Sequence, residues 1–221
     1  MAVLFLLAVS IGCVLARPSS ENVTPVEVTL YYETMCPSCR LFVPSQLLPA
    51  YTDTKFDYTS LISKLTLVPY GWVKVKNATS HEYQCQHGQS ECEGNRLHSC
   101  AIKYIPDQLT TLEYISCLDN LESEYLAFES SVYPIDKCQD KLPGGLYSKI
   151  IDCYNSEEGW TLFQINGEKT TSFFTSPAYV PYVSYNNKRD DDLADSSIED
   201  FKMTLCKVAG VVNWQDCSSW N

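Results

Sequence analysis

The sequence predicts an α/β fold built around a redox turn, and three observations support this prediction. An apolar, β-branched run at 26–32 has alternate residues that suit a strand facing a core. The pair Cys36 and Cys39 follows it at Cys-x-x-Cys spacing, and 41–48 then has the apolar pattern of a helix. A Cys-x-x-Cys between a strand and a helix is typical of a thioredoxin-like site, whose disulfide opens and closes without unfolding the chain.

The next elements favour a parallel strand pair. The short apolar run 65–68 ends in a Pro-Tyr-Gly turn and is typical of a second strand, while 72–76 alternates and is expected to extend that strand or to form a hairpin with it. Pro44 is expected to kink the intervening helix, because proline removes a backbone donor. Pro49 and the polar stretch 52–55 mark a break after this helix. Strand, helix and strand make one βαβ unit, which favours parallel pairing.

The pattern changes between about residues 80 and 155. Cysteines become dense, strand patterns disappear, and apolar residues recur at helical intervals in 109–118 and again in 146–153 after a Pro-Gly-Gly turn. We therefore expect a helical, disulfide-rich insertion within the thioredoxin-like unit.

The C-terminal part contains one ambiguous segment and one predicted helix. Residues 159–170 suit either a strand closed by an Asn-Gly turn or a helix, and a loop, a β-rich run and a turn follow. Ser196 and Glu199 form a predicted capping box for the last helix, whose apolar face is expected to carry Ile198, Phe201, Leu205 and Val208. The acidic run 190–192 is interpreted as a solvated turn.

The N-terminus and the cysteine count indicate the secretory route. Residues 1–16 are interpreted as a signal peptide, and no later run reaches the roughly 18 apolar residues of a membrane span. The prediction is one thioredoxin-like domain at 17–221. Cys13, one of eleven cysteines, is expected to be removed with the signal peptide, which leaves ten. An even number of cysteines in a secreted chain predicts disulfides. Sequons at Asn22 and Asn77 predict glycosylation.

The charge of the chain limits its partners. The formal net charge is −11 and the sequence pI is about 4.6. Such a chain repels nucleic acid and anionic membranes, so neither is an expected partner. Protonation of carboxylates in an acidic compartment would relieve the self-repulsion, which is compatible with an endosome or lysosome.

The redox pair has two expected roles. Backbone N–H groups at a helix start favour the thiolate, so Cys36 is the expected nucleophile, and Cys39 is placed to resolve the mixed disulfide. A thiol of pKa about 8.5 is roughly one part in 3,000 thiolate at pH about 5, whereas a pKa of about 6 gives roughly a tenth. This gain exceeds the roughly tenfold loss of nucleophilicity, so catalysis at acidic pH requires a depressed Cys36 pKa.

Two plainer interpretations of the same motif are a structural disulfide and half of a zinc site. Zinc would need a second ligand pair and reduced thiols, which a secreted chain with an even cysteine count disfavours. We expect no metal. Glu33 and Arg40 flank the redox pair, and as exposed charges they are expected to have little effect.

The segment from Cys85 to Cys100 reads CQHGQSECEGNRLHSC. It resembles the signature of the gamma-interferon-inducible lysosomal thiol reductase family, Cys-Gln-His-Gly-x2-Glu-Cys-x2-Asn-x4-Cys. All the fixed positions match: Cys85, Gln86, His87, Gly88, Glu91, Cys92, Asn95 and Cys100. The resemblance covers most of the mature chain. It implies a helix at 159–170 and a cis-proline at Pro181 in a loop across from the redox pair.

The resemblance also implies a function. It suggests a thiol reductase that acts on disulfides of protein substrates in endosomes or lysosomes, or after secretion, and aids unfolding and proteolysis in antigen processing or host defence. An external thiol such as cysteine or glutathione would restore the oxidised site, with no tightly bound cofactor. The signature cysteines are expected to form disulfides, and His87 is expected to be structural more often than acid–base.

Two alternatives stay open at this point. The same dithiol serves an oxidase or isomerase, depending on a redox potential that the sequence does not give. The chain also fits a secreted, non-catalytic binding module whose Cys-x-x-Cys forms a structural disulfide. The pairing of the eight other cysteines and the oligomeric state are not predicted.

Overall fold

The computed structural model describes residues 23–121, 132–175, 179–212 and 217. The predicted signal peptide and the sequon at Asn22 lie outside the described residues. No described helix has the length and apolarity needed to cross a bilayer.

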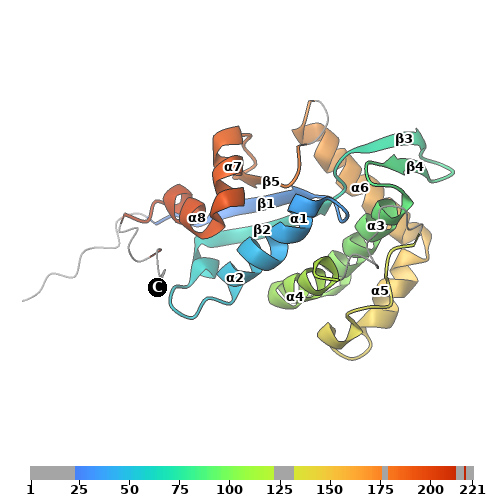
Figure 1. The fold of residues 1–221 in the computed structure, drawn as a ribbon, viewed down its shortest axis with the longest axis horizontal. Helices are drawn as coiled ribbons and strands as arrows, with labels where there is room; N and C mark the ends of the chain where they lie inside the picture. The colour runs from blue at the N-terminus through green and yellow to red at the C-terminus, as the bar shows by residue number, and fades with distance from the viewer. Residues whose placement is uncertain (1–22, 122–131, 176–178, 213–216, 218–221) are drawn as a thin grey trace, which may run out of the picture.

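A three-stranded sheet in the order β2-β1-β5 carries the redox helix (Figure 1). The central strand β1 (Val26–Tyr32) pairs in parallel with β2 (Ile62–Pro69) and antiparallel with β5 (Tyr182–Tyr185). Val28 and Leu30 of β1 are buried against the helices, as the alternating pattern predicts. The predicted βαβ unit is confirmed.

The redox helix runs as three consecutive segments. α1 (Pro37–Phe42) continues into a π-helical turn (Val43–Leu47) and then into α2 (Leu48–Tyr51). Pro44 lies in the π-helical turn, which accommodates the backbone donor that proline lacks. The helix ends at Tyr51, directly before the polar stretch 52–55, so the predicted break is confirmed there. Pro49 does not mark it, because this proline lies in the first turn of α2, where its missing N–H is tolerated. A 3₁₀ turn, Tyr58–Leu61, leads into β2.

The alternating segment after β2 does not pair with it. β3 (Val73–Asn77) forms an antiparallel hairpin with β4 (Glu82–Cys85), as a separate two-stranded sheet. The sequence expectation of no strand after residue 80 is therefore wrong at β4. Asn77, the second sequon, is exposed at the end of β3.

Four helices build a second core beside the sheet. These are α3 (Gln89–Tyr104), α4 (Gln108–Asp119), α5 (Leu146–Tyr154) and α6 (Glu157–Phe173), which gather on one side of the molecule in Figure 1. A 3₁₀ turn, Gln139–Lys141, precedes α5. The helical insertion is confirmed, and the ambiguous segment 159–170 is helical, as the resemblance implies.

Among the described residues, the eight cysteines outside the redox pair all form disulfides: Cys85–Cys92, Cys100–Cys153, Cys117–Cys138 and Cys206–Cys217. The second of these ties α3 to α5 within the helical core. The expected disulfide role of the three signature cysteines is confirmed.

The C-terminal helix begins earlier than the sequence suggests. α7 (Asp191–Glu199) starts in the acidic run, where the Asp190 carboxylate accepts a hydrogen bond from the Leu193 N–H. The interpretation of this run as a turn is wrong, because carboxylates stabilise the first turn of a helix. Ser196 lies inside α7 and bonds the Asp192 carbonyl, so the predicted capping box is also wrong.

A second helix, α8 (Phe201–Ala209), follows after a break at Asp200. The Asp200 carboxylate caps it by accepting from the Met203 N–H. Phe201 and Leu205 are fully buried against the sheet core, as their helical spacing predicts. The apolar face was therefore predicted correctly although the helix start was not.

Candidate redox site

Cys36 and Cys39 lie at the start of the helix that follows β1. Cys36 occupies the N-cap position of α1, half-buried, with Pro37 as the first helical residue. Cys39 lies one turn further on and is 1% exposed. Both are free cysteines. Local sequence explains this start, because proline at the first helical position needs no backbone partner for its nitrogen.

The two sulfurs differ in proton affinity. A hydrogen bond from the Cys39 thiol, together with backbone N–H groups of Cys39 and Ser38, lowers the pKa of Cys36 to about 6. Burial opposes this shift, and the nearby His87 adds a smaller contribution that lowers the pKa. Burial, followed by the neighbouring Cys36 sulfur, raises the pKa of Cys39. The depressed Cys36 pKa that acidic catalysis requires is thus present.

A loop distant in sequence closes over the nucleophile. The Val180–Pro181 peptide bond is cis, as the resemblance implies. The Val180 carbonyl oxygen lies 3.9 Å from the Cys36 sulfur, although 144 residues separate the two. The expectation that this loop faces the redox pair is confirmed. Docking of a substrate backbone on Pro181 stays a prediction.

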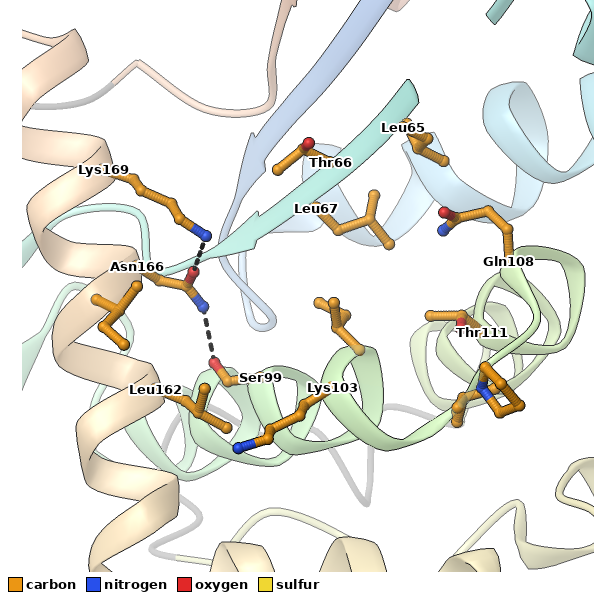
Figure 2. A pocket seen from close by; sticks show the side chains of 14 residues that line it. Leu65, Thr66, Leu67, Ser99, Lys103, Gln108, Thr111, Leu162, Asn166 and Lys169 are labelled. Carbon is orange, nitrogen blue, oxygen red and sulfur yellow. Dashed lines mark hydrogen bonds between the residues drawn. The ribbon is translucent and has the colours of Figure 1, made fainter. Parts of the chain in front are cut away.

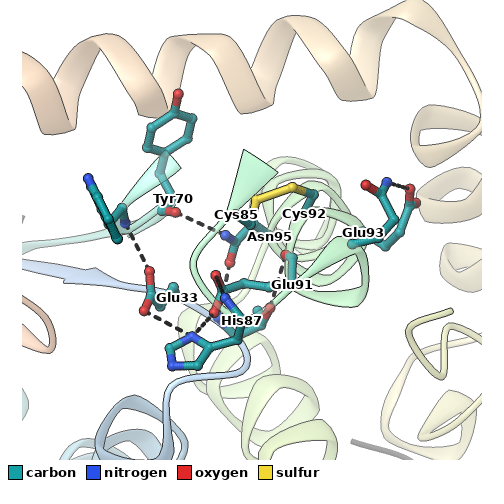
Figure 3. Close-up of a disulfide and its surroundings, with 11 residues drawn as sticks. Glu33, Tyr70, Cys85, His87, Glu91, Cys92, Glu93 and Asn95 are labelled. Atoms are coloured by element: carbon teal, nitrogen blue, oxygen red, sulfur yellow. Dashed lines mark hydrogen bonds and ion pairs between the residues drawn. A yellow bond between two sulfur atoms is a disulfide. The ribbon is translucent and has the colours of Figure 1, made fainter. Parts of the chain in front are cut away.

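The signature histidine belongs to a cluster with two glutamates (Figure 3). His87 Nδ1 lies 2.6 Å from Glu91 Oε2 and 3.3 Å from Glu33 Oε1. Glu91 Oε1 accepts from the His87 backbone N–H, and Glu33 Oε2 accepts from the Trp72 N–H at 2.9 Å. We call Glu33, His87 and Glu91 the carboxylate–histidine cluster.

The interpretation of Glu33 as an exposed charge is wrong. Its side chain is 1% exposed, and that of Glu91 is fully buried. Burial, followed by repulsion from Glu91, raises the pKa of Glu33 to about 8. Burial also raises the pKa of Glu91 to about 8, and the Cys36 sulfur adds to that rise. Gly71 makes room for the Glu33 carboxylate, since a Cβ at this positive-φ position would overlap it.

Asn95, another signature residue, joins the redox loop to the end of β2. Its side-chain oxygen accepts from the Thr34 N–H, and its amide donates to the Tyr70 carbonyl, each at 3.0 Å. The disulfide Cys85–Cys92 fixes the chain around His87 between β4 and α3 (Figure 3). The signature therefore supports the loop that precedes Cys36.

Arg40 also differs from its predicted exposed state. Its guanidinium is half-buried and donates to the carbonyl oxygens of Asp119 and Leu121 at 3.0–3.2 Å. These contacts tie α1 to the end of α4. They also turn the positive charge toward α4.

Among the described residues, one group of His, Cys, Asp and Glu donor atoms is close enough to share a cation. It is the carboxylate–histidine cluster, whose donor atoms lie within 4.8 Å of one another. Its shortest contact is a hydrogen bond between His87 and Glu91, the arrangement of groups that share protons. The sequence analysis missed this cluster, although His87 and Glu91 stand four residues apart and Glu33 precedes Cys36 by three.

A separate cavity of about 410 Å³ lies between β2, α3, α4 and α6 (Figure 2). Its polar side includes Asn166, which donates to the Ser99 hydroxyl and accepts from Lys169. Neither redox cysteine and no fixed signature position lines this cavity. It is therefore not the candidate site.

Comparisons with known proteins give one matching family model and several relatives. A family model described as "Gamma interferon inducible lysosomal thiol reductase (GILT)" matches residues 27–142. A GILT-like protein of Anopheles gambiae is 31% identical over 82% of this chain and 76% of its own length. A protein of Carassius auratus named gamma-interferon-inducible lysosomal thiol reductase is 30% identical over 88% of this chain and 73% of its own length.

A solved structure supports the fold. The crystal structure of Chlamydia trachomatis DsbA superposes with a TM-score of 0.56 at 16% identity, covering 86% of this chain and 89% of that one. At this identity the likeness concerns the fold alone. The thioredoxin-like fold predicted from the sequence is confirmed.

Proposed function

We propose that this protein, which belongs to the gamma interferon inducible lysosomal thiol reductase family, reduces disulfide bonds in protein substrates through Cys36 and Cys39. One observation carries the proposal. Of the cysteines in the described residues, these two alone are unpaired, and they occupy a helix start beside the Val180–Pro181 loop.

The proposed reaction has two steps. The Cys36 thiolate attacks one sulfur of the substrate disulfide, forms a mixed disulfide and displaces the other sulfur as a thiolate. Cys39 then attacks the Cys36 sulfur, releases the second substrate thiol and leaves a Cys36–Cys39 disulfide. Two molecules of an external thiol, such as cysteine or glutathione, reduce this disulfide and become oxidised to their own disulfide. The chemistry uses no resident metal or cofactor.

The pKa of Cys36 supports activity in an acidic compartment. A thiol with the ordinary pKa of 9.0 is about one part in ten thousand thiolate at pH about 5, whereas a pKa of about 6 gives about a tenth. We place the protein in endosomes or lysosomes, in part because its relatives from Mus musculus and Carassius auratus are named lysosomal. There, disulfide reduction would unfold proteins for proteolysis, in antigen processing or host defence.

Two exposed aromatic residues support protein substrates. Trp72 is 51% exposed, and its backbone N–H contacts Glu33 beside the redox loop. Tyr179 is 53% exposed and precedes the Val180 carbonyl that faces Cys36. Such residues offer apolar contact area to an unfolded polypeptide near the nucleophile.

A second candidate function is oxidation of protein thiols. The depressed pKa of Cys36 stabilises the reduced site, and stabilising the dithiol form makes the corresponding disulfide a stronger oxidant. The equilibrium of the Cys36–Cys39 pair with glutathione distinguishes the two directions. An equilibrium that lies far toward the reduced protein and oxidised glutathione would support oxidation of substrates.

Insulin reduction with cysteine as the reductant, measured from acidic to neutral pH, tests the proposal. Cys36→Ser should lower the rate to that of cysteine alone, and Cys39→Ser should accumulate a mixed disulfide with insulin. The double variant Cys206→Ser/Cys217→Ser, which removes a disulfide and leaves both redox cysteines in place, serves as the control. Undiminished insulin reduction by Cys36→Ser would refute the mechanism.

A further inference from the structure

We infer that the carboxylate–histidine cluster stores a proton for the redox site: it takes up a proton when the Cys36–Cys39 disulfide is reduced and releases it when that disulfide re-forms. This inference rests on the proposed role of Cys36 and Cys39. It assigns a positioning role to Glu33, His87 and Glu91, which act on the sulfur chemistry through charge.

The geometry places two carboxyl groups on one imidazole nitrogen. His87 Nδ1 lies 2.6 Å from Glu91 and 3.3 Å from Glu33, and neither glutamate is more than 1% exposed. Glu33 Oε1 is buried and accepts no hydrogen bond, so it points into the cluster with a free lone pair. His87 is 18% exposed at the edge of the cluster, which gives protons a route to solvent.

Charge counting shows why the cluster needs a proton. Two carboxylates beside one imidazole carry a net charge of −1 even when the imidazole is protonated, and such a charge is costly to bury. Within the described residues, no lysine or arginine forms an ion pair with Glu33 or Glu91, and Arg40 on the adjacent helix is turned to the carbonyls of Asp119 and Leu121. A second proton, shared by the glutamates, makes the cluster neutral.

The groups that face the cluster link it to the sulfurs. From the loop and α1 these are Cys36 and Cys39, and the remaining contacts are backbone N–H groups of Met35, Trp72, Gln86 and His87. Burial raises the pKa of both glutamates, and the Cys36 sulfur adds a smaller contribution to that rise. When Cys36 enters a disulfide its negative charge disappears, and both carboxyls become stronger acids. By linkage, reduction of the disulfide draws a proton to the cluster.

The electrons and protons balance in both half-reactions. Two external thiols supply two electrons and two protons as their own disulfide forms and the Cys36–Cys39 bond breaks. One proton goes to Cys39, and the other goes to a glutamate of the cluster while Cys36 remains a thiolate. In substrate reduction the first displaced thiolate takes up the proton that the cluster releases, and the second takes the proton of Cys39.

The effect is measurable in a defined pH window. Above pH about 6 the reduced site holds Cys36 as thiolate, and below pH about 8 the reduced cluster holds its extra proton. Between these values, a site without the cluster takes up one proton per disulfide reduced. With the cluster the number rises above one.

Calorimetric reduction of the oxidised protein by a dithiol, in buffers of different ionisation enthalpy near pH 7, counts these protons once the two protons that the dithiol releases on oxidation are added to the measured exchange. The wild type should take up clearly more than one proton, whereas Glu33→Gln and Glu91→Gln should take up about one. Glu93→Gln makes the same charge change on α3, but Glu93 pairs with Arg96, so this control should match the wild type. Uptake of one proton by the wild type, or equal uptake by all variants, overturns the inference.

A second measurement uses the wild type alone and therefore does not depend on whether the variants fold. In the wild type, the infrared difference spectrum between reduced and oxidised protein should show a protonated carboxyl band that is lost on oxidation, and absence of that band overturns the inference. Neither readout requires substrate turnover. If Cys36→Ser is inactive and the proton count is one, only the cluster assignment fails; if Cys36→Ser still reduces insulin, the proposed function fails.

Discussion

Cys36 and Cys39 differ because their sulfurs have different surroundings. Cys36 is half-buried and receives hydrogen bonds from the Cys39 thiol and from backbone N–H groups, all of which favour its thiolate. Cys39 is buried beneath it, where the charged form is disfavoured. The same motif therefore supplies one sulfur that attacks the substrate and one that resolves the mixed disulfide.

We expect alkylation of the reduced protein by iodoacetamide to report this difference. The rate at Cys36 should rise about tenfold per pH unit below pH about 6 and level off above it, because the thiolate fraction saturates there. Cys39 should remain unmodified until the fold is opened. Mass spectrometry of quenched samples measures both, and Cys36→Ser is the control that removes the fast phase. A midpoint near 9 would contradict the depressed pKa.

The same shift affects stability with a definite sign. The pKa of Cys36 is lower in the folded, reduced protein than in the unfolded chain, so its thiolate stabilises the fold. This contribution is fully present above pH about 9 and is lost as the pH falls through about 6. Reduced Cys36→Ser should lack this part of the pH dependence of the unfolding free energy.

Helix α3 is the element that holds the redox loop in place. Glu91 and Asn95 of this helix bond to His87 and to Thr34, and Gly94 lets the helix approach the loop closely. A Cβ at Gly94 would overlap the Thr34 hydroxyl and lie 2.7 Å from the Tyr133 ring. The contact between α3 and the loop thus depends on a missing side chain.

Gly94→Ala should destabilise the oxidised protein by about 1 to 3 kcal/mol, the usual range for overpacking a close contact. Gly144→Ala is the matched control, since a Cβ there meets nothing within 4 Å, and its effect should stay within about 1 kcal/mol. Urea unfolding followed by circular dichroism measures both. Equal free energies of unfolding for the two variants would show that the loop moves aside at little cost.

The sequence predicted those elements whose signals are local. The alternation in β1 and the Cys-x-x-Cys at its end defined the redox unit, and helical spacing defined the apolar faces of α4 and α8. The partner of β3 was missed because β4 has only four residues, too few for its alternation of polar and apolar residues to stand out as a strand.

Other features depend on residues far apart in the chain. Glu33 was expected to be exposed, and its burial arises from contacts with Trp72 and His87, which lie 39 or more positions away. No window around Glu33 contains that information. The signature indicated that His87 and Glu91 matter, but only the fold brings them to the redox loop.

At the scale of the whole molecule, two cores must stay together for the site to exist. One core packs α1, α2 and α8 against the sheet, and the other joins α3, α4 and α5. The redox loop lies where the two meet, because Met35 is buried in the helical core and Cys36 packs on the sheet core. The disulfides stabilise these cores to different degrees.

Loop length predicts the order of these effects. Cys100–Cys153 closes a sequence separation of 53 residues, Cys206–Cys217 one of 11 and Cys85–Cys92 one of 7. If each disulfide acts mainly by restricting the unfolded chain, removing the pair by double Ala substitution should cost about 4, 3 and 2.5 kcal/mol, respectively. Urea unfolding with the redox pair alkylated isolates this effect from the chemistry of Cys36. A larger loss for Cys85–Cys92 than for Cys100–Cys153 would show that the signature disulfide stabilises the native contacts around His87, beyond its effect on the unfolded chain.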